Sequence, residues 1–262
     1  MDCKKALTNA AGDFAKAERI LKELGLAAAA KRSGKPTNEG RIFTAVTNHG
    51  AALLELSCET DFVARNADFI ALGNAIVDRV AREDLTIDDP QIAAEIQAAI
   101  STIKENMAAR RAKRLTAEGN ERIVQYVHGE GGNIGVLVKI RAGTPGTLQS
   151  ETVQRFAFDC ALHVAAFNPS FLSKETVPGE YLKEQEEIFM QQARNLGKPE
   201  KVLEGIVKGK LNKHLSEICF LEQPFVKDDK RSVAKVAADI GKETDDEITV
   251  SDFAYFKVGE QE

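Results

Sequence analysis

The chain has 262 residues, of which 43% are hydrophobic and 29% charged, and 40 acidic against 35 basic side chains give it a net charge of -5 at pH 7. This length holds one large domain or two to three small ones. The negative charge argues against a dedicated nucleic-acid-binding protein, which usually has a basic surface. No apolar run approaches the roughly 20 residues that cross a bilayer, and the first residues lack the apolar segment of a signal peptide. We therefore expect a cytoplasmic protein with no membrane and no direct nucleic-acid partner.

The N-terminal residues 1–26 are predicted to form a small helical domain of two short helices. Asp13 is suited to cap a helix over residues 14–24, and Gly25 suits its C-terminal end. Two helices bury little surface on their own, so we expect the domain to be incomplete at its N-terminus. Residues 27–40, with a basic centre, read as a linker.

Residues 41–118 are predicted to form the first of two α+β subdomains, the core N-subdomain. An Asn-His-Gly turn between two apolar runs is typical of a β-hairpin, and Pro90 marks a helix start. The predicted elements are strands at 42–47 and 51–57, a helix at 67–82 and a helical segment over 92–115 with a break inside it.

A second subdomain of the same plan is expected in residues 119–179 and 218–262, with a helix that stops before Pro169. The two subdomains resemble each other in the order of their elements and only weakly in sequence, which favours two similar α+β layers. The predicted elements are strands at 122–127, 134–140 and 248–258 and helices at 152–167 and 232–240.

Residues 180–217 differ from the rest, because two helical segments flank Gly197-Lys198-Pro199. Gly at a helix end and Pro at a helix start predict a tight helix–helix turn. The result is an antiparallel helical hairpin roughly 25 Å long at 1.5 Å per residue. We expect it to protrude from the body of the protein.

The candidate binding tip is Thr60-Asp61-Phe62-Val63, where an apolar strand meets the next helix. Thr60 and Asp61 are residues that cap helices well. A rigid scaffold that presents a short polar and aromatic corner often binds partners. The alternative is that Phe62 is an ordinary core residue, as most Phe side chains are.

No catalytic pattern is convincing. Residues 29–36 (AAKRSGKP) resemble a phosphate-binding loop but lack its first Gly and its Ser or Thr. Cys160 and His163 share a helix face without an orienting third group, and the four cysteines, read as reduced thiols, have no metal-ligand spacing. The tract 110–114 (RRAKR) is interpreted as a solvated helix face, with contact to RNA or an acidic partner as alternatives. We expect no enzymatic activity, no cofactor and no metal site.

Six short motifs, in this order, make the chain resemble bacterial translation elongation factor Ts over nearly its whole length. Each motif is weak alone, whereas six in order are highly specific. The motifs are MDCKKAL at 1–7, ETDFVA at 59–64, NIGVL at 133–137, HVAA at 163–166, GKP at 197–199 and QPFV at 223–226.

The resemblance implies a guanine nucleotide exchange factor that binds elongation factor Tu, both GDP-bound and nucleotide-free, and promotes GDP release. It implies an N-terminal ubiquitin-associated-like domain, a core of two α+β subdomains and a protruding hairpin. In that family the Asp and Phe of TDFV approach the G domain near its magnesium site, and the Phe wedges between partner helices. The partner-binding residues implied here are Thr60, Asp61, Phe62, Val63, Ile134, Gly135, His163, Met1, Lys4 and Lys5.

Two departures from the family pattern affect the ends of the chain. The family usually has a helix and a glycine-rich turn ahead of MDCKKAL, so we expect an N-terminal domain without its first helix. Many members also have a helix after the last strand, which this sequence does not show before residue 262. Both departures bear on the affinity for the partner.

Two other functions compete with the exchange factor. One is a non-catalytic adaptor or chaperone-like protein that binds partners through the helical hairpin. The other is an enzyme that uses Cys160 and His163, which thiol alkylation would inactivate. The sequence leaves open whether the protein forms a homodimer or a heterotetramer with its partner.

Overall fold

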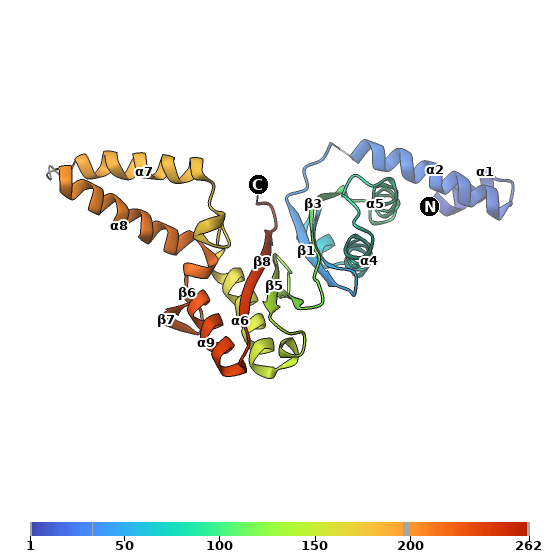
Figure 1. The fold of residues 1–262 in the computed structure, drawn as a ribbon. Helices are drawn as coiled ribbons and strands as arrows, with labels where there is room; N and C mark the ends of the chain where they lie inside the picture. The colour runs from blue at the N-terminus through green and yellow to red at the C-terminus, as the bar shows by residue number, and fades with distance from the viewer. Residues whose placement is uncertain (1, 33, 196–199, 261–262) are drawn as a thin grey trace. The chain divides into compact units, whose positions relative to one another are not determined.

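The computed structural model describes residues 2–32, 34–195 and 200–260, and it is a mixed α+β protein, as expected (Figure 1). Its contacts divide the chain into two compact units, which we describe separately. Unit 1 comprises Met1–Thr116, Val127–Leu137 and Ala254–Glu262, and unit 2 comprises Ala117–Tyr126 and Val138–Phe253. In the described ranges, none of the helices has the length and apolarity to cross a membrane.

Two helices begin unit 1, α1 (Asp2–Asn9) and α2 (Phe14–Arg32), and they pack through small buried side chains such as Ala6 and Ala17. The expected helix end at Gly25 and the start of a linker at residue 27 are wrong, since α2 continues to Arg32. Gly25 instead allows close packing, because a Cβ there would lie 2.7 Å from Cβ of Ser101. The alanines that follow Gly25 are strong helix formers.

Unit 1 contains an antiparallel sheet of order β1-β2-β3. Residues Leu54, Leu56, Phe69, Ile76 and Ile92 contribute to its buried core. The strands are β1 (Glu39–Val46), β2 (Ala51–Cys58) and β3 (Met107–Leu115), and the helices are α3 (Asp61–Ala64), α4 (Ala67–Glu83) and α5 (Pro90–Ile103).

The third strand corrects two predictions. The helical segment expected over 92–115 ends at Ile103, where Lys104 adopts a left-handed φ of 68°, and it continues as a strand and not as a second helix. The tract 110–114 is therefore part of β3 and not a helix face. Ala, Arg, Lys and Leu favour helices in isolation, but pairing along the whole of β2 decides the outcome.

The second sheet has the order β4-β5-β8. Its strands are β4 (Glu121–His128), β5 (Ile134–Ala142) and β8 (Ile248–Lys257). Unit 2 contains the helices α6 (Glu151–Phe167) and α9 (Val233–Thr244), the short strands β6 (Pro224–Phe225) and β7 (Asp228–Ser232), and the 3₁₀ turns η1 (Thr147–Gln149), η2 (Lys174–Thr176) and η3 (Phe220–Glu222).

The remaining helices of unit 2, α7 (Gly179–Arg194) and α8 (Glu200–Ile218), lie side by side (Figure 1). Between them, Ala193, Leu203 and Val207 form one small apolar cluster. A polar link joins the same helices, because the Tyr181 hydroxyl is hydrogen-bonded to Nε2 of His214 at 2.8 Å. The predicted Gly-Lys-Pro turn lies outside the described residues.

Candidate functional site

The TDFV segment forms a corner between β2 and α4. Phe62 lies on the single turn of α3 and is 82% exposed, so the interpretation of Phe62 as a core residue is wrong. Its neighbours behave differently: Ala64 is buried, and Val63 packs against the apolar core of unit 1. One side of the corner is therefore anchored to the core of unit 1, and the other side presents the phenyl ring of Phe62 to solvent.

Thr60 caps this turn, as its sequence position predicts. Its backbone is extended (φ -131°, ψ 155°), and its Oγ1 accepts a hydrogen bond from the Val63 N–H at 3.4 Å. The Glu105 carboxylate accepts two further hydrogen bonds from Thr60, from the N–H at 3.0 Å and from the hydroxyl at 2.7 Å. Glu105 lies just before β3 and was not among the residues that the sequence singled out.

Glu59, the residue before Thr60, also anchors the corner. One of its oxygens accepts the Asn106 N–H at 2.6 Å, and the side chains of Arg32 and Lys35 each approach its carboxylate at 3.1 Å. The Asn106 N–H, followed by the Lys35 and Arg32 side chains, lowers the pKa of Glu59 against the opposing effect of burial. Glu59 therefore stays ionised and holds the corner to the end of α2.

The thiol beneath the corner is unreactive in this setting. Cys58 is buried, and its Sγ donates to the Thr60 carbonyl at 3.2 Å. Burial, followed by the nearby Glu105 carboxylate, raises the pKa of Cys58 to about 12. A thiol with so high a pKa does not supply a thiolate nucleophile at neutral pH.

Asp61, the first residue of α3, forms an exposed ion pair with Arg65, which follows the turn, at 3.3 Å from Nη2. The side chain of Asp61 is 49% exposed and that of Arg65 is 72% exposed. Surface pairs of this kind contribute about 0–1 kcal/mol. The Asp61 carboxylate is therefore free to exchange Arg65 for another partner at little cost.

Ile134 and Gly135 begin β5 and belong to unit 1. Ile134 is half-buried, whereas Gly135 is buried against Ile42 of β1. A Cβ at position 135 would collide with Cγ2 of Ile42 and lie 3.4 Å from Leu53. Gly135 is thus required for the close approach of β5 to this part of unit 1.

His163 lies inside unit 2 with no exposed surface. Its Nδ1 accepts the Val226 N–H at 3.1 Å, so Nε2 carries the proton and donates to Oε1 of Gln223 at 2.8 Å. The ring also lies against Phe220 and Phe225, with centroids 5.3 and 6.1 Å away. Burial lowers the pKa of His163, which keeps the ring neutral. The side chain does not reach a surface where it would contact a partner directly.

The alternative of a Cys160–His163 dyad has no support in this geometry. Both ring nitrogens of His163 are occupied by Gln223 and Val226. Cys160 is fully buried, and burial, followed by the charge of Asp159, raises the pKa of its thiol well above the ordinary value. Neither an exposed thiolate nor a free base is therefore available.

The N-terminal candidates are exposed where they are described. Lys4 and Lys5 lie on the solvent side of α1, and Met1 lies outside the described residues. Phe14, at the start of α2, is 77% exposed. Phe14 was not among the candidate binding residues that the sequence singled out.

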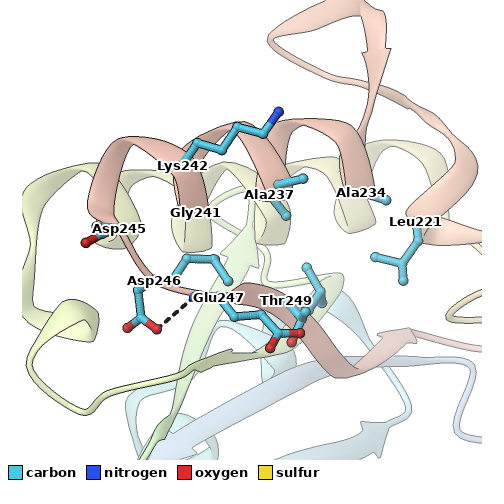
Figure 2. A pocket seen from close by; sticks show the side chains of 12 residues that line it. Leu221, Ala234, Ala237, Gly241, Lys242, Asp245, Asp246, Glu247 and Thr249 are labelled. Atoms are coloured by element: carbon cyan, nitrogen blue, oxygen red, sulfur yellow. Dashed lines mark hydrogen bonds between the residues drawn. The ribbon is translucent and has the colours of Figure 1, made fainter.

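A groove of about 630 Å³ within unit 2 runs between α9 and β8 (Figure 2). Its wall is mostly apolar, with Ala237 and Ile248 among its residues. At one end of the groove, the carboxylate of Asp246 accepts hydrogen bonds from the N–H groups of Glu247 and Thr144. A hydrogen bond from the Thr147 hydroxyl contributes most to lowering the pKa of Asp246, which falls to about 2.

Across the parts of the chain that the structure describes, His, Cys, Asp and Glu side chains form no cluster suited to a metal ion.

An anchored corner that exposes an aromatic ring is a common form of binding surface on a rigid scaffold. The chain matches the sequence model of the family described as Elongation factor TS over residues 59–260. It is 45% identical to elongation factor Ts of Treponema denticola, over 99% of this chain and 92% of that protein. It is 45% identical to elongation factor Ts of Borrelia recurrentis, over 98% of this chain and 93% of that protein. It is 41% identical to elongation factor Ts of Borreliella burgdorferi, over 98% of this chain and 92% of that protein. The chain belongs to the elongation factor Ts family, which makes it a translation factor.

Proposed function

We propose that this protein binds elongation factor Tu, in its GDP-bound and nucleotide-free forms, and accelerates the release of GDP during translation elongation in the cytoplasm. Family membership supports the partner, and the exposure of Phe62 carries the proposal. A phenyl ring that is 82% exposed on an anchored turn is suited to insertion into an apolar pocket. Burial of such a side chain contributes about 1.5–3 kcal/mol.

The exchange mechanism is a linkage between two ligands of one G domain. GDP and this protein each bind the G domain, and each weakens the binding of the other by the same factor. Phe62 favours a conformation of the G domain in which the magnesium–phosphate region is distorted, because only that conformation accepts the ring. Exchange of this kind makes and breaks no covalent bond, so the protein acts as a binding factor and not as an enzyme.

Asp61 supplies the charged part of this contact. Its pairing with Arg65 at 3.3 Å is exposed and weak, so the carboxylate can turn to the partner as the ring of Phe62 enters. A carboxylate near the magnesium site disfavours the bound phosphates by charge repulsion. Thr60 and Val63 hold the turn in place.

The remaining candidates act around this corner. Ile134 adds half-buried apolar surface, and Gly135 allows β5 to approach β1 closely. Lys4 and Lys5 offer exposed positive charge on α1 to a second surface of the partner. His163 supports the packing of unit 2 from inside, which is the role that its burial favours.

The test is the release of a fluorescent GDP analogue from elongation factor Tu, with and without this chain, at fixed magnesium concentration. Acceleration by substoichiometric amounts is the expected result. Binding without acceleration would instead favour the adaptor function. Sedimentation of the purified complex measures whether one or two copies of each protein assemble.

A further inference from the structure

Beyond the last backbone pair of β2 and β3, hydrogen bonds from side chains continue to join the two chain segments. The ladder ends with Cys58 opposite Met107. One residue further on, the Glu59 carboxylate accepts the Asn106 N–H at 2.6 Å. The Thr60 N–H then donates to the Glu105 carboxylate at 3.0 Å. Two carboxylates, one from each side, therefore set the direction in which the chain leaves the sheet toward α3.

Glu105 also fixes the hydroxyl of Thr60. This hydroxyl has one hydrogen, and that hydrogen is directed to Oε1 of Glu105 at 2.7 Å. A lone pair on the same oxygen is then left to accept the Val63 N–H and cap the turn. The carboxylate thus acts on both polar groups that Thr60 presents, and through the cap it acts on α3.

The turn needs such support because it is short. α3 has four residues, Asp61–Ala64, and a single helical turn is not stable alone in water. Ala64 and Val63 hold it on the core side. At its N-terminal end, the bonds from Thr60 to Glu105 hold the residue that caps the turn.

We propose that Glu105 is a positioning residue for nucleotide exchange, which holds the Thr60 cap so that α3 presents Phe62 in the orientation that the partner binds. The inference rests on the proposed exchange function. Without the carboxylate, the corner samples more orientations, and binding has to restrict them at a cost in free energy.

The first test compares exchange rates for Glu105→Gln and a matched control. Glutamine keeps the shape of the side chain but replaces one acceptor oxygen by an NH₂ group, so one of the two bonds from Thr60 is lost. The control is Glu95→Gln, which removes a carboxylate that pairs with Arg79 at 2.6 Å elsewhere in unit 1. We expect exchange catalysed by Glu105→Gln to slow about tenfold, and exchange by Glu95→Gln to match the wild type.

A double-mutant cycle separates positioning from general support of the fold. If Glu105 acts through Phe62, Glu105→Gln slows the wild-type protein but adds little to the loss already caused by Phe62→Ala. Additive losses would overturn the inference, because they would show that Glu105 acts independently of the ring. An unchanged rate for Glu105→Gln, with an active wild type, would also overturn it. An inactive wild type would instead overturn the proposed exchange function, and the inference with it.

The second test needs no partner. The chain contains no tryptophan, so Phe62→Trp introduces a single indole at the corner, and its time-resolved anisotropy reports how freely the side chain moves. We expect the indole at position 62 to move faster and over a wider angle in the Glu105→Gln background. In the Glu95→Gln background, its motion should match that in the otherwise unchanged protein. Thr60→Val removes the hydroxyl bond to Glu105 together with the cap on Val63, so Glu105→Gln should add little to the effect of Thr60→Val on the anisotropy. Equal anisotropy in all backgrounds would overturn the inference even if Glu105→Gln proved less stable.

Discussion

Nε2 of His163 and Oε1 of Gln223 lie 2.8 Å apart in the interior of unit 2, although 60 residues separate them in the chain. The amide of Gln223 donates in turn to the Glu217 carbonyl at 2.6 Å, in the last turn of α8. His163 therefore joins α6 to the base of the helical pair α7–α8. The HVAA and QPFV motifs meet around the ring of His163.

Removal of His163 should destabilise the protein strongly. We expect His163→Ala to lower the free energy of unfolding by about 2–4 kcal/mol, because it opens a cavity and leaves Gln223 and the Val226 N–H without their partner. Urea unfolding followed by circular dichroism measures the change. His49→Ala, at an exposed position, should stay within about 0.5 kcal/mol of the wild type. A small effect at both positions would contradict the structural role of His163.

The same histidine should make stability depend on pH. Burial lowers the pKa of His163 below its ordinary value of 6.5, so between the two pKa values the unfolded state binds more protons than the folded state. Stability then rises with pH in this range, and it falls as the pH drops below about 6.5. Urea midpoints from pH 7.5 to 5.5 should decline more for the wild type than for His163→Gln. Parallel curves would show that another group causes the decline.

Gly135 should not tolerate a side chain. The added methyl group of Gly135→Ala would meet Cγ2 of Ile42, which is 1% exposed and has no room to move. We expect a loss of about 1–3 kcal/mol from overpacking. Gly146→Ala is the matched control, since its backbone is helical (φ -62°, ψ -37°) and nothing lies within 4 Å of the new Cβ.

A double mutant tests the cause of that loss. Ile42→Ala removes the methyl group that Gly135→Ala would strike, so the two changes together should cost less than the sum of the single changes. Thermal unfolding of the four proteins measures this difference. If the losses of stability from Gly135→Ala and Ile42→Ala simply add, the strain caused by Gly135→Ala lies elsewhere in unit 1.

The sequence predicted the elements whose signals are local. The Thr60 cap, Pro90 at a helix start and the hairpin around residues 48–50 each depend on neighbouring residues, and all three are present. The strand β3 was missed because its helix-forming residues are held in a strand by pairing with β2.

Only part of the candidate site could be predicted from the sequence. The motif identified Phe62, and its exposure could not be inferred from an apolar residue type alone. Glu105 gave no signal, since it meets Thr60 across 45 residues of chain. His163 was expected at a surface, and only the fold reveals that its polar partners are internal.

The final prediction concerns Phe62 and the proposed exchange activity. Phe62→Ala should slow the release of a fluorescent GDP analogue from elongation factor Tu by about 10- to 100-fold, which corresponds to the roughly 1.5–3 kcal/mol that burial of the ring contributes. The free energy of unfolding should change little, because the ring is 82% exposed in the free protein. Phe158→Ala is the matched control: its ring is 47% exposed on α6 and contacts Tyr126 edge-on, and exchange should proceed at the wild-type rate. A Phe62→Ala protein that exchanges normally would remove the corner from the mechanism, whereas slow exchange with an unchanged unfolding curve would locate the activity at this ring.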